Sequence, residues 1–501
     1  MKKIISYTMT AFIGLIFLSS CRNENSQENG EQEAISQKND LPENHEPRHR
    51  VIILTDIEAD PDDTQSLIRL FLYANEIDIQ ALVATTSVWR KSDIQPDSIR
   101  TTIQKYGEVY DTLSQHASGY PTEGELLELV LSGQPGYGME SVGTGIDTDG
   151  SNAIISELEK DDDRPLWISV WGGVNTLAQA LLTIRENYDS DVASKMIEKL
   201  RVYTISDQDD SGIWIRREYP ELFYIISPGS YARSVWTSFT RTSAEFDQFG
   251  TNEWYAENIQ QNHGPLGAHY PDVVWGVEGD TPAFLSLIPN GLNEPDRPDW
   301  GGWGGRYELY TPTPEEIGVG DGNLGPGGVP LEPEPRPIWT NADDTYTHWI
   351  PQSNGRAITP GEVTDTSAKM TLLRWKNDIQ KDFAARMDWT MSDYENANHP
   401  PRVVLAHESQ LTASSGDSIT LNAFGTSDPD GDSLSYHWFN YPEAGTLDEP
   451  IDLGHAVNDF DVHFQLPEVD QTETAHFILR VTDKGEPSLT RYARVIVTIE
   501  P

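Results

Sequence analysis

The chain has 501 residues and a formal net charge of −45, from 80 acidic and 35 basic side chains. A surface this acidic repels phosphate, which excludes nucleic acid as a partner. The length favours two or three domains, and 14 Trp, 20 Tyr and 37% hydrophobic residues are enough for a sizeable core.

The first 21 residues have the pattern of a bacterial lipoprotein signal peptide. Lys2 and Lys3 precede the apolar run FIGLIFL, and LSSC follows. We expect Cys21 to carry lipid as the first residue of the mature protein, which predicts a place in the bacterial cell envelope, with membrane contact only through this anchor. The alternative is a plain signal peptide that happens to contain a cysteine. Residues 22–48 lack an apolar period and are rich in Asn, Gln, Glu and Ser, which predicts a disordered tether.

From residue 49 onward, short apolar runs alternate with amphipathic ones. The strand-like runs are RVIILT, IDIQALVATTS, RPLWISVWGG, LRVYTIS and ELFYIIS. Between them, Val174, Leu177, Ala178, Leu181 and Leu182 follow the spacing of one apolar helix face. Continuous apolar strands separated by helices predict an α/β domain over residues 49–396, with a parallel sheet covered by helices on both faces.

The pattern changes after NANHPP, where two consecutive prolines stop a helix and extend the chain. Beyond it the apolar residues alternate with polar ones, as in SLSYHWF and RVIVTIE, and turns such as SDPDGDS separate the runs. Residues 397–501 are therefore predicted to form a β-sandwich of immunoglobulin type. We expect the segment 398–401 to link two independently folded units.

Five carboxylates follow the first apolar strand within eight positions. They are Asp56, Glu58, Asp60, Asp62 and Asp63. Like charges at the end of a buried strand repel one another and raise each other's pKa values, so the crowding needs a positive partner. Several carboxylates around one point are the ligand set of a hard cation, Ca²⁺ or Mg²⁺. The alternative is that Asp60 and Asp62 cap the following helix and the others are solvated.

The stretch DIEADPDD, followed by a helix and by IDIQALVATTS, resembles the N-terminal signature of nucleoside hydrolases, Asp-x-Asp-Pro-Gly-x-Asp-Asp. This resemblance implies a Ca²⁺ cofactor and a metal-bound water as the nucleophile. It places Asp56 on the first acidic position, the calcium ligand and general base on Glu58, a sugar-hydroxyl ligand on Asp62, and a bidentate calcium ligand on Asp63. Matches to GGVNT and EGDTPAFL add, as metal ligands, the backbone carbonyl of Asn175 and the side chain of Asp280.

Four positions depart from the nucleoside hydrolase pattern, the first being Ala59, which stands where the family has Pro. Glu58 stands where the family has Asp, and Asp60 stands where it has Gly, so Asp60 is an alternative ligand or base. Gly279 replaces the histidine that precedes the late aspartate, so a leaving-group acid of that type is absent. Release of a purine or pyrimidine base is therefore the less favoured reaction.

Longer stretches resemble a bacterial family described as cellulose-binding proteins, whose members carry a nucleoside-hydrolase-like domain followed by an immunoglobulin-like domain. They are TISDQDDSGIWIRREYPELFYIISPG, HGPLGAHYPDVVWGVEGDTPAFLSLIPNGLNEPDRPDWGGWGGRYEL and TSDPDGDSLSYHWFNYPEAGT. This resemblance covers nearly all of the chain after the tether and implies carbohydrate as the partner.

Other residues could contact a sugar substrate. Asp207, Gln208 and Asp209 follow the strand LRVYTIS and could bind sugar hydroxyls, although a polar loop would have the same composition. Trp300 and Trp303 lie among glycines and either pack inward or stack on a ligand. His263 is a possible substrate contact or acid, although a lone histidine more often has a structural role.

We therefore expect a cell-surface, calcium-dependent glycosyl hydrolase that acts on an N- or O-linked sugar, with Glu58, Asp60 and Asp62 as the catalytic candidates. The alternatives are a non-catalytic lipoprotein that binds cellulose or another polysaccharide, and a nucleoside hydrolase. An acidic set that is retained favours the enzyme, because a protein that only binds carbohydrate has no need of it.

Overall fold

The computed structural model describes residues 48–239, 251–274, 276–320, 322, 324–353, 358–454 and 456–501. The predicted signal peptide with Cys21, and residues 22–47 of the predicted tether, lie outside these ranges. No helix within the described ranges is long and apolar enough to cross a membrane.

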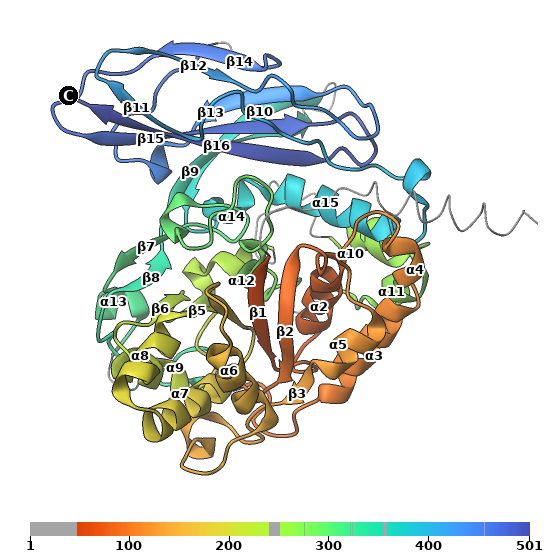
Figure 1. Ribbon diagram of the computed structural model, residues 1–501, viewed down its shortest axis with the longest axis vertical. Coiled ribbons are helices and arrows are strands. Elements are labelled where there is room, and N and C mark those ends of the chain that lie inside the picture. Colours follow the sequence, from red (N-terminus) through yellow and green to blue (C-terminus); the bar gives the residue numbers. More distant parts are fainter. Residues whose placement is uncertain are drawn as a thin grey trace, which may run out of the picture. The chain divides into compact units, whose positions relative to one another are not determined.

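An eight-stranded, mostly parallel sheet forms the centre of the first region, as predicted (Figure 1). In spatial order its strands are β3 (Val130–Ser132), β2 (Ile77–Ala84), β1 (His49–Thr55), β4 (Leu166–Val170), β5 (Leu200–Thr204), β6 (Phe223–Ile226), β8 (Ile338–Asn341) and β7 (Tyr307–Tyr310). The edge strand β7 runs antiparallel to β8. The other neighbouring strands pair in parallel.

Helices cover both faces of this sheet because its strands are apolar on both sides. Val51 and Ile53 of β1 belong to one buried cluster, and Ile52 and Leu54 belong to the other. The first cluster includes residues of α2 (Asp62–Leu72), α3 (Pro96–Gly107), α12 (Pro282–Leu285) and α15 (Lys376–Asp388). The second includes residues of α6 (Asp149–Glu159), α7 (Asn175–Asn187), α8 (Ser190–Glu198) and α9 (Ser211–Glu218).

Shorter helices complete this region. They are α4 (Tyr110–Leu113), α5 (Glu123–Glu128), α10 (Asn252–Tyr255), α11 (Gly264–His269), α13 (Pro314–Ile317) and α14 (Met370–Leu373). An antiparallel hairpin of β9 (Asp344–Ser353) and β10 (Ile358–Ser367) precedes α14.

The strand order reverses between β1 and β4. The chain goes from β1 to β2 and β3 on one side, and then returns to place β4 on the other side of β1. In open α/β sheets, ligands bind in the crevice outside the carboxyl ends of the strands at such a reversal. Asp56 directly follows β1, so the acidic run lies at this position.

The last hundred residues form two antiparallel layers, consistent with the predicted β-sandwich. One sheet has the order β11 (Gln410–Ser414), β16 (Thr490–Glu500), β15 (Glu473–Thr482) and β13 (Ser435–Asn440). Its strands pair antiparallel except for β11 with β16. The other sheet pairs β12 (Ser418–Asn422) with β14 (Asp461–Gln465). Trp438, Phe477 and Val497 are buried in the cluster that these strands enclose.

The two regions pack against each other, because the described residues from 48 to 501 form one compact unit. Tyr492 of β16 is buried in the first α/β core cluster, and its backbone N–H donates to the Asn290 carbonyl at 3.0 Å. Arg494 donates to the carbonyls of Leu292 and Gly301. The sandwich therefore packs against the core of the α/β region, and the independent folding of the two regions stays a prediction.

Candidate functional site

The acidic loop, residues 56–63, joins β1 to α2 and is held in a tight turn. The Ala59 N–H donates to the Asp56 carbonyl at 2.9 Å, and the Ile57 N–H donates to the Thr55 hydroxyl at 3.1 Å. Pro61 then leads into α2, whose first turn begins with Asp62 and Asp63. A helix N-terminus favours negative charge, so the local sequence places its carboxylates where backbone dipoles support them.

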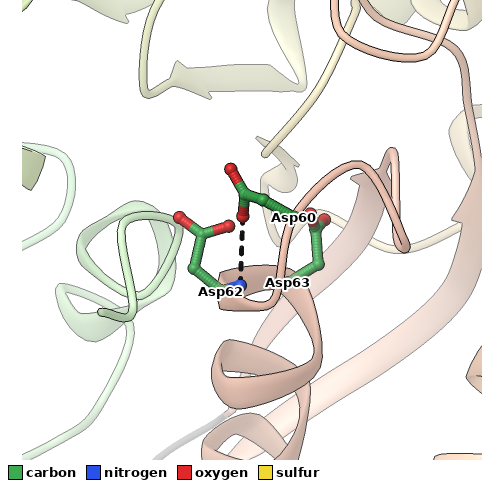
Figure 2. A group of neighbouring side chains, drawn as sticks. All are labelled: Asp60, Asp62 and Asp63. Carbon is green, nitrogen blue, oxygen red and sulfur yellow. Dashed lines mark hydrogen bonds between the residues drawn. The ribbon is translucent and has the colours of Figure 1, made fainter. Parts of the chain in front are cut away.

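Three carboxylates of this loop gather at the N-terminal end of α2 (Figure 2). One carboxylate oxygen from each of Asp60, Asp62 and Asp63 lies within 4.8 Å of the others. Asp60 accepts a hydrogen bond from the Asp62 backbone N–H at 3.1 Å, as Figure 2 shows. The Thr55 hydroxyl donates to Asp63, which orients the Asp63 side chain. Capping of the helix requires only one of these three carboxylates, so capping does not explain why the other two are present.

Burial and mutual repulsion disfavour the charged forms of the neighbouring carboxylates. Burial, followed by repulsion from Asp62, Asp63, Asp60 and Asp56, raises the pKa of Asp280 well above its usual range. Burial and the same kind of neighbours raise the pKa values of Asp62 and Asp63. Burial raises the pKa of Asp56 to about 7, although the Ser87 hydroxyl and the Arg90 guanidinium act in the opposite direction. The structure thus brings Asp56, Asp60, Asp62, Asp63 and Asp280 together.

Glu58 does not join this group. Its side chain is exposed, and its backbone φ of 74° lies in the left-handed region, which is uncommon for a residue other than glycine. Arg90 donates to the Glu58 carbonyl at 3.0 Å. The structure therefore does not support the ligand and base roles predicted for Glu58, whereas Asp60, the alternative, lies among the buried carboxylates.

The loop after β4 approaches the acidic loop closely. A Cβ added to Gly172 would lie 2.6 Å from an Asp56 carboxylate oxygen, and one added to Gly173 would lie 2.5 Å from Asp209. Asn175 begins α7, and its side-chain amide donates to the Gly136 carbonyl at 2.8 Å, while its own amide oxygen is buried without a partner among the described residues. The predicted turn is thus present beside Asp56.

The three polar residues after β5 have structural partners, although Asp207 and Asp209 also line a small cavity. Asp207 forms an ion pair with Arg216 at 2.7 Å. Asp209 accepts hydrogen bonds from the N–H groups of Ser211 and Asn175, the first residues of α9 and α7, and burial raises its pKa to about 6. These contacts argue against the predicted sugar contacts of Asp207 and Asp209. Gln208 donates to the Trp171 carbonyl at 2.6 Å, and its side-chain oxygen is buried without a partner within the described chain.

Trp300, Trp303 and His263 do not lie in the acidic group. Trp303 is completely buried and its indole N–H donates to the Tyr492 hydroxyl at 3.4 Å, so its predicted sugar stacking is wrong. The Trp300 ring contacts His476 of the C-terminal sandwich, and the Arg297 guanidinium lies 4.3 Å from its centroid.

His263 is buried and pairs with Asp388 at 2.9 Å, at the end of α15. This contact gives it a structural role and argues against the predicted substrate contact.

Three aromatic residues near the acidic loop were not identified from the sequence. The Tyr231 hydroxyl lies beside the side chains of Ser206 and Trp89, and Asp56 and Asp60 act on it electrostatically. The Tyr231 and Trp236 rings meet edge to face, with centroids 4.9 Å apart. Trp236 in turn lies beside Gly279. All three aromatic residues follow the carboxyl ends of β2 or β6, so topology was the signal that could have found them.

The donor set fits a hard divalent cation. The side chains of Asp56, Asp63 and Asp280 are at most 3% exposed, and Asp280 has a buried carboxylate oxygen with no hydrogen-bond partner among the described residues. Carboxylate oxygens are the ligands that Ca²⁺ prefers, and a cation would offset the repulsion that raises their pKa values.

Comparison with known proteins agrees with this architecture. The family model for cellulose-binding Sde182, nucleoside hydrolase-like domain, matches residues 50–307, and the model for the cellulose-binding protein Sde0182 C-terminal domain matches residues 418–499. No curated protein matches the chain.

Among solved structures, a nucleoside hydrolase-related hypothetical protein from Saccharophagus degradans, described as associated with carbohydrate metabolism, is 34% identical, with a TM-score of 0.74. The match covers 91% of this chain and 100% of that one. The type III effector XopQ, solved with adenosine diphosphate ribose, is 15% identical over 52% of this chain and 86% of its own, with a TM-score of 0.26. The chain therefore belongs to the family of cellulose-binding Sde182 proteins, with a nucleoside-hydrolase-like domain and the family's C-terminal domain.

Proposed function

We propose that this protein is a calcium-dependent hydrolase that cleaves a glycosyl bond in carbohydrate. The observation that carries the proposal is the group of five carboxylates at the strand reversal, three of them almost completely buried. Such a group destabilises the fold unless a cation binds there. A protein that only bound carbohydrate would gain nothing from buried carboxylates that lower its stability.

Each residue has a role in this proposal. Asp56, Asp63 and Asp280 hold Ca²⁺, together with the backbone carbonyl of Asn175. Bound there, Ca²⁺ would neutralise the carboxylates and polarise the oxygen atoms of substrate and water that it holds. Asp62, the more accessible residue of the first turn, accepts hydrogen bonds from sugar hydroxyls.

Asp60 acts as the general base. It accepts a proton from the water whose oxygen attacks the anomeric carbon. The bond from that carbon to the leaving group breaks with its electron pair, which stays on the leaving atom, and that atom takes a proton from solvent. Charge that develops on the sugar ring is stabilised by the surrounding carboxylates.

The experiment is incubation of the whole protein with oligosaccharides from plant and algal polysaccharides and with nucleosides, in calcium and in chelator. The expected result is release of sugar from an oligosaccharide in calcium, which is lost in chelator and in Asp63→Asn. Sugar release that is the same in chelator, or no release from any substrate in calcium, would contradict the proposal.

A non-catalytic carbohydrate-binding protein is the second candidate. It is favoured by Gly279, which offers no leaving-group acid, and by an exposed aromatic pair on the sandwich, Phe424 and Phe460, whose ring centroids are 6.1 Å apart. This candidate predicts that Asp63→Asn binds cellulose as well as the unmodified protein does, while neither protein releases sugar.

We further propose that Cys21 is lipidated and holds the protein at the bacterial cell envelope. The lipobox LSSC and the polar segment after it support this proposal. Cys21→Ala is expected to move the protein from the membrane fraction to the soluble fraction, and unchanged membrane association would contradict it.

A further inference from the structure

The carboxyl ends of β2 and β6 place three large aromatic side chains around the acidic loop. Trp89 follows β2 and is 53% exposed, whereas most large aromatic side chains of this region are buried. Tyr231 and Trp236 follow β6 and are partly exposed. A single exposed aromatic residue is ordinary, but exposed aromatic residues that gather in one patch mark a ligand-binding surface.

Contacts tie the three residues to one another and to the carboxylates. The Tyr231 hydroxyl lies beside the Trp89 side chain, and Asp56 and Asp60 influence it electrostatically. The Trp236 ring approaches Gly279, which lies next to Asp62. A Cβ on Gly279 would lie 2.6 Å from an Asp62 oxygen and 3.0 Å from the Trp236 ring. The aromatic residues therefore border the same space as the acidic loop.

Trp236 occupies the space that a side chain at position 279 would need. A Cβ at this position would meet both the Asp62 carboxylate and the indole, so only glycine fits between them. The Trp236 indole nitrogen is buried without a hydrogen-bond partner among the described residues. The exposed part of the Trp236 side chain is therefore the ring and not its nitrogen, so a ligand can meet Trp236 only through the aromatic surface.

The angle between the rings favours a sugar over a nucleobase. Tyr231 and Trp236 are inclined by 76°, so they form a corner and not a parallel slot. A flat base gains most from stacking between parallel faces. A sugar ring instead offers an apolar C–H face to one aromatic ring and hydroxyl groups to the polar edges of the other.

We propose that Trp89, Tyr231 and Trp236 form an aromatic wall that binds a sugar ring of an O-linked oligosaccharide beside the acidic loop. This inference rests on the proposed function and names its substrate class. The ring on the wall belongs to the part of the oligosaccharide next to the bond that is cleaved. Asp62 contacts the sugar that contains the anomeric carbon.

The test is calorimetric titration of cellotetraose and of adenosine into Asp60→Asn, in calcium, so that turnover does not obscure binding. Adding Trp89→Ala is expected to weaken cellotetraose binding about tenfold or more, because a large aromatic contact face is lost. Trp89→Phe should restore most of the affinity. Tyr231→Phe, which removes only the hydroxyl, should give a smaller loss.

The matched control is Leu309→Ala, which removes an apolar side chain that is 55% exposed on the edge strand β7, close to the 53% exposure of Trp89. It should leave cellotetraose binding at the wall unchanged. The inference is overturned if Trp89→Ala has no effect, if Leu309→Ala removes the binding, or if adenosine binds and cellotetraose does not. Melting curves of each variant separate loss of binding from loss of folding.

The outcomes also separate this inference from the proposed function. Binding that depends on Trp89, in a protein that hydrolyses no substrate, would support the wall and contradict the hydrolase. Hydrolysis of an oligosaccharide that Trp89→Ala does not alter would support the hydrolase and overturn the wall.

Discussion

Gly172 lies so close to Asp56 that a Cβ on the glycine would be 2.6 Å from the nearer carboxylate oxygen and 2.8 Å from the Asp56 Cβ. The loop after β4 thus fixes the side chain of Asp56, the residue that directly follows β1. This contact joins the two strands between which the strand order reverses, and it holds Asp56 in its buried position.

Gly172→Ala should displace Asp56 and weaken calcium binding roughly 10-fold to 100-fold, as loss of a supporting contact to a metal ligand commonly does. Calorimetric titration with Ca²⁺ measures this change. The control is Gly124→Ala on the exposed helix α5, where an added Cβ would meet no atom within 4 Å. Equal calcium affinity in Gly172→Ala and the unmodified protein would contradict the role of this contact.

Substitutions of Glu58 and Asp60 can be compared directly for their effects on calcium affinity and turnover. Because Glu58 is exposed and Asp60 lies with Asp62 and Asp63, Glu58→Gln should leave calcium affinity nearly unchanged, whereas Asp60→Asn should weaken it and abolish turnover. Each substitution removes one charge and preserves side-chain length. The opposite order, with Glu58→Gln the more damaging, would restore Glu58 to the role that the family signature gives it.

The interface with the sandwich predicts a loss of stability. Arg480 of β15 pairs with Asp378, which is almost completely buried and also accepts a hydrogen bond from Tyr492. Arg480→Met should lower the free energy of unfolding by about 2 kcal/mol, because it leaves the buried Asp378 carboxylate without its positively charged partner. Urea denaturation measures this change.

The control for this interface is Arg217→Met, whose ion pair with Glu332 is half exposed and should contribute no more than about 0.5 kcal/mol. If Arg480→Met is as harmless as this control, the sandwich is an appended module and the linker expectation from the sequence is supported.

Several features could be predicted from the sequence because they depend on local patterns. Apolar runs and helix periodicity predict the parallel sheet, and the density of carboxylates after Leu54 predicts the acidic loop. Both signals come from residues that are close along the chain.

Other features depend on partners far away in sequence. Trp303 is buried because it meets Tyr492, 189 positions later, and Arg216, the partner of Asp207, is held by Glu334, 118 positions later. The outward orientation of Glu58 follows from a turn that Arg90 supports from the loop after β2. Composition and spacing contain none of these contacts, so the substrate-facing residues were the least predictable part of the site.

A buried histidine predicts a pH dependence of stability. Burial lowers the pKa of His116 from 6.5 to about 4, and the neighbouring His399 lowers it further. The Ser392 carbonyl, Asp393 and Asp430 act in the opposite direction and raise this pKa. Between these two pH values the unfolded chain binds more protons at this residue than the folded chain does. The free energy of unfolding should therefore fall as the pH is lowered through this window.

His116→Gln removes this titratable group. The slope of the free energy of unfolding against pH should therefore decrease by up to about 1.4 kcal/mol per pH unit. Denaturation at several pH values from 7 to 4 measures the slope. An unchanged slope would show that His116 is not held in its neutral form.

The most direct test of the central claim is calorimetric titration of Ca²⁺ into the unmodified protein and into Asp63→Asn, with melting curves in parallel. Asp63→Asn removes one charge, while its side-chain oxygen can still accept the hydrogen bond from Thr55. We predict saturable calcium binding to the unmodified protein, with stabilisation of about 2.7 kcal/mol at a hundredfold excess over Kd, and weaker binding to the variant. No saturable binding to the unmodified protein, with Asp63→Asn neutral or stabilising, would contradict the calcium-centred account.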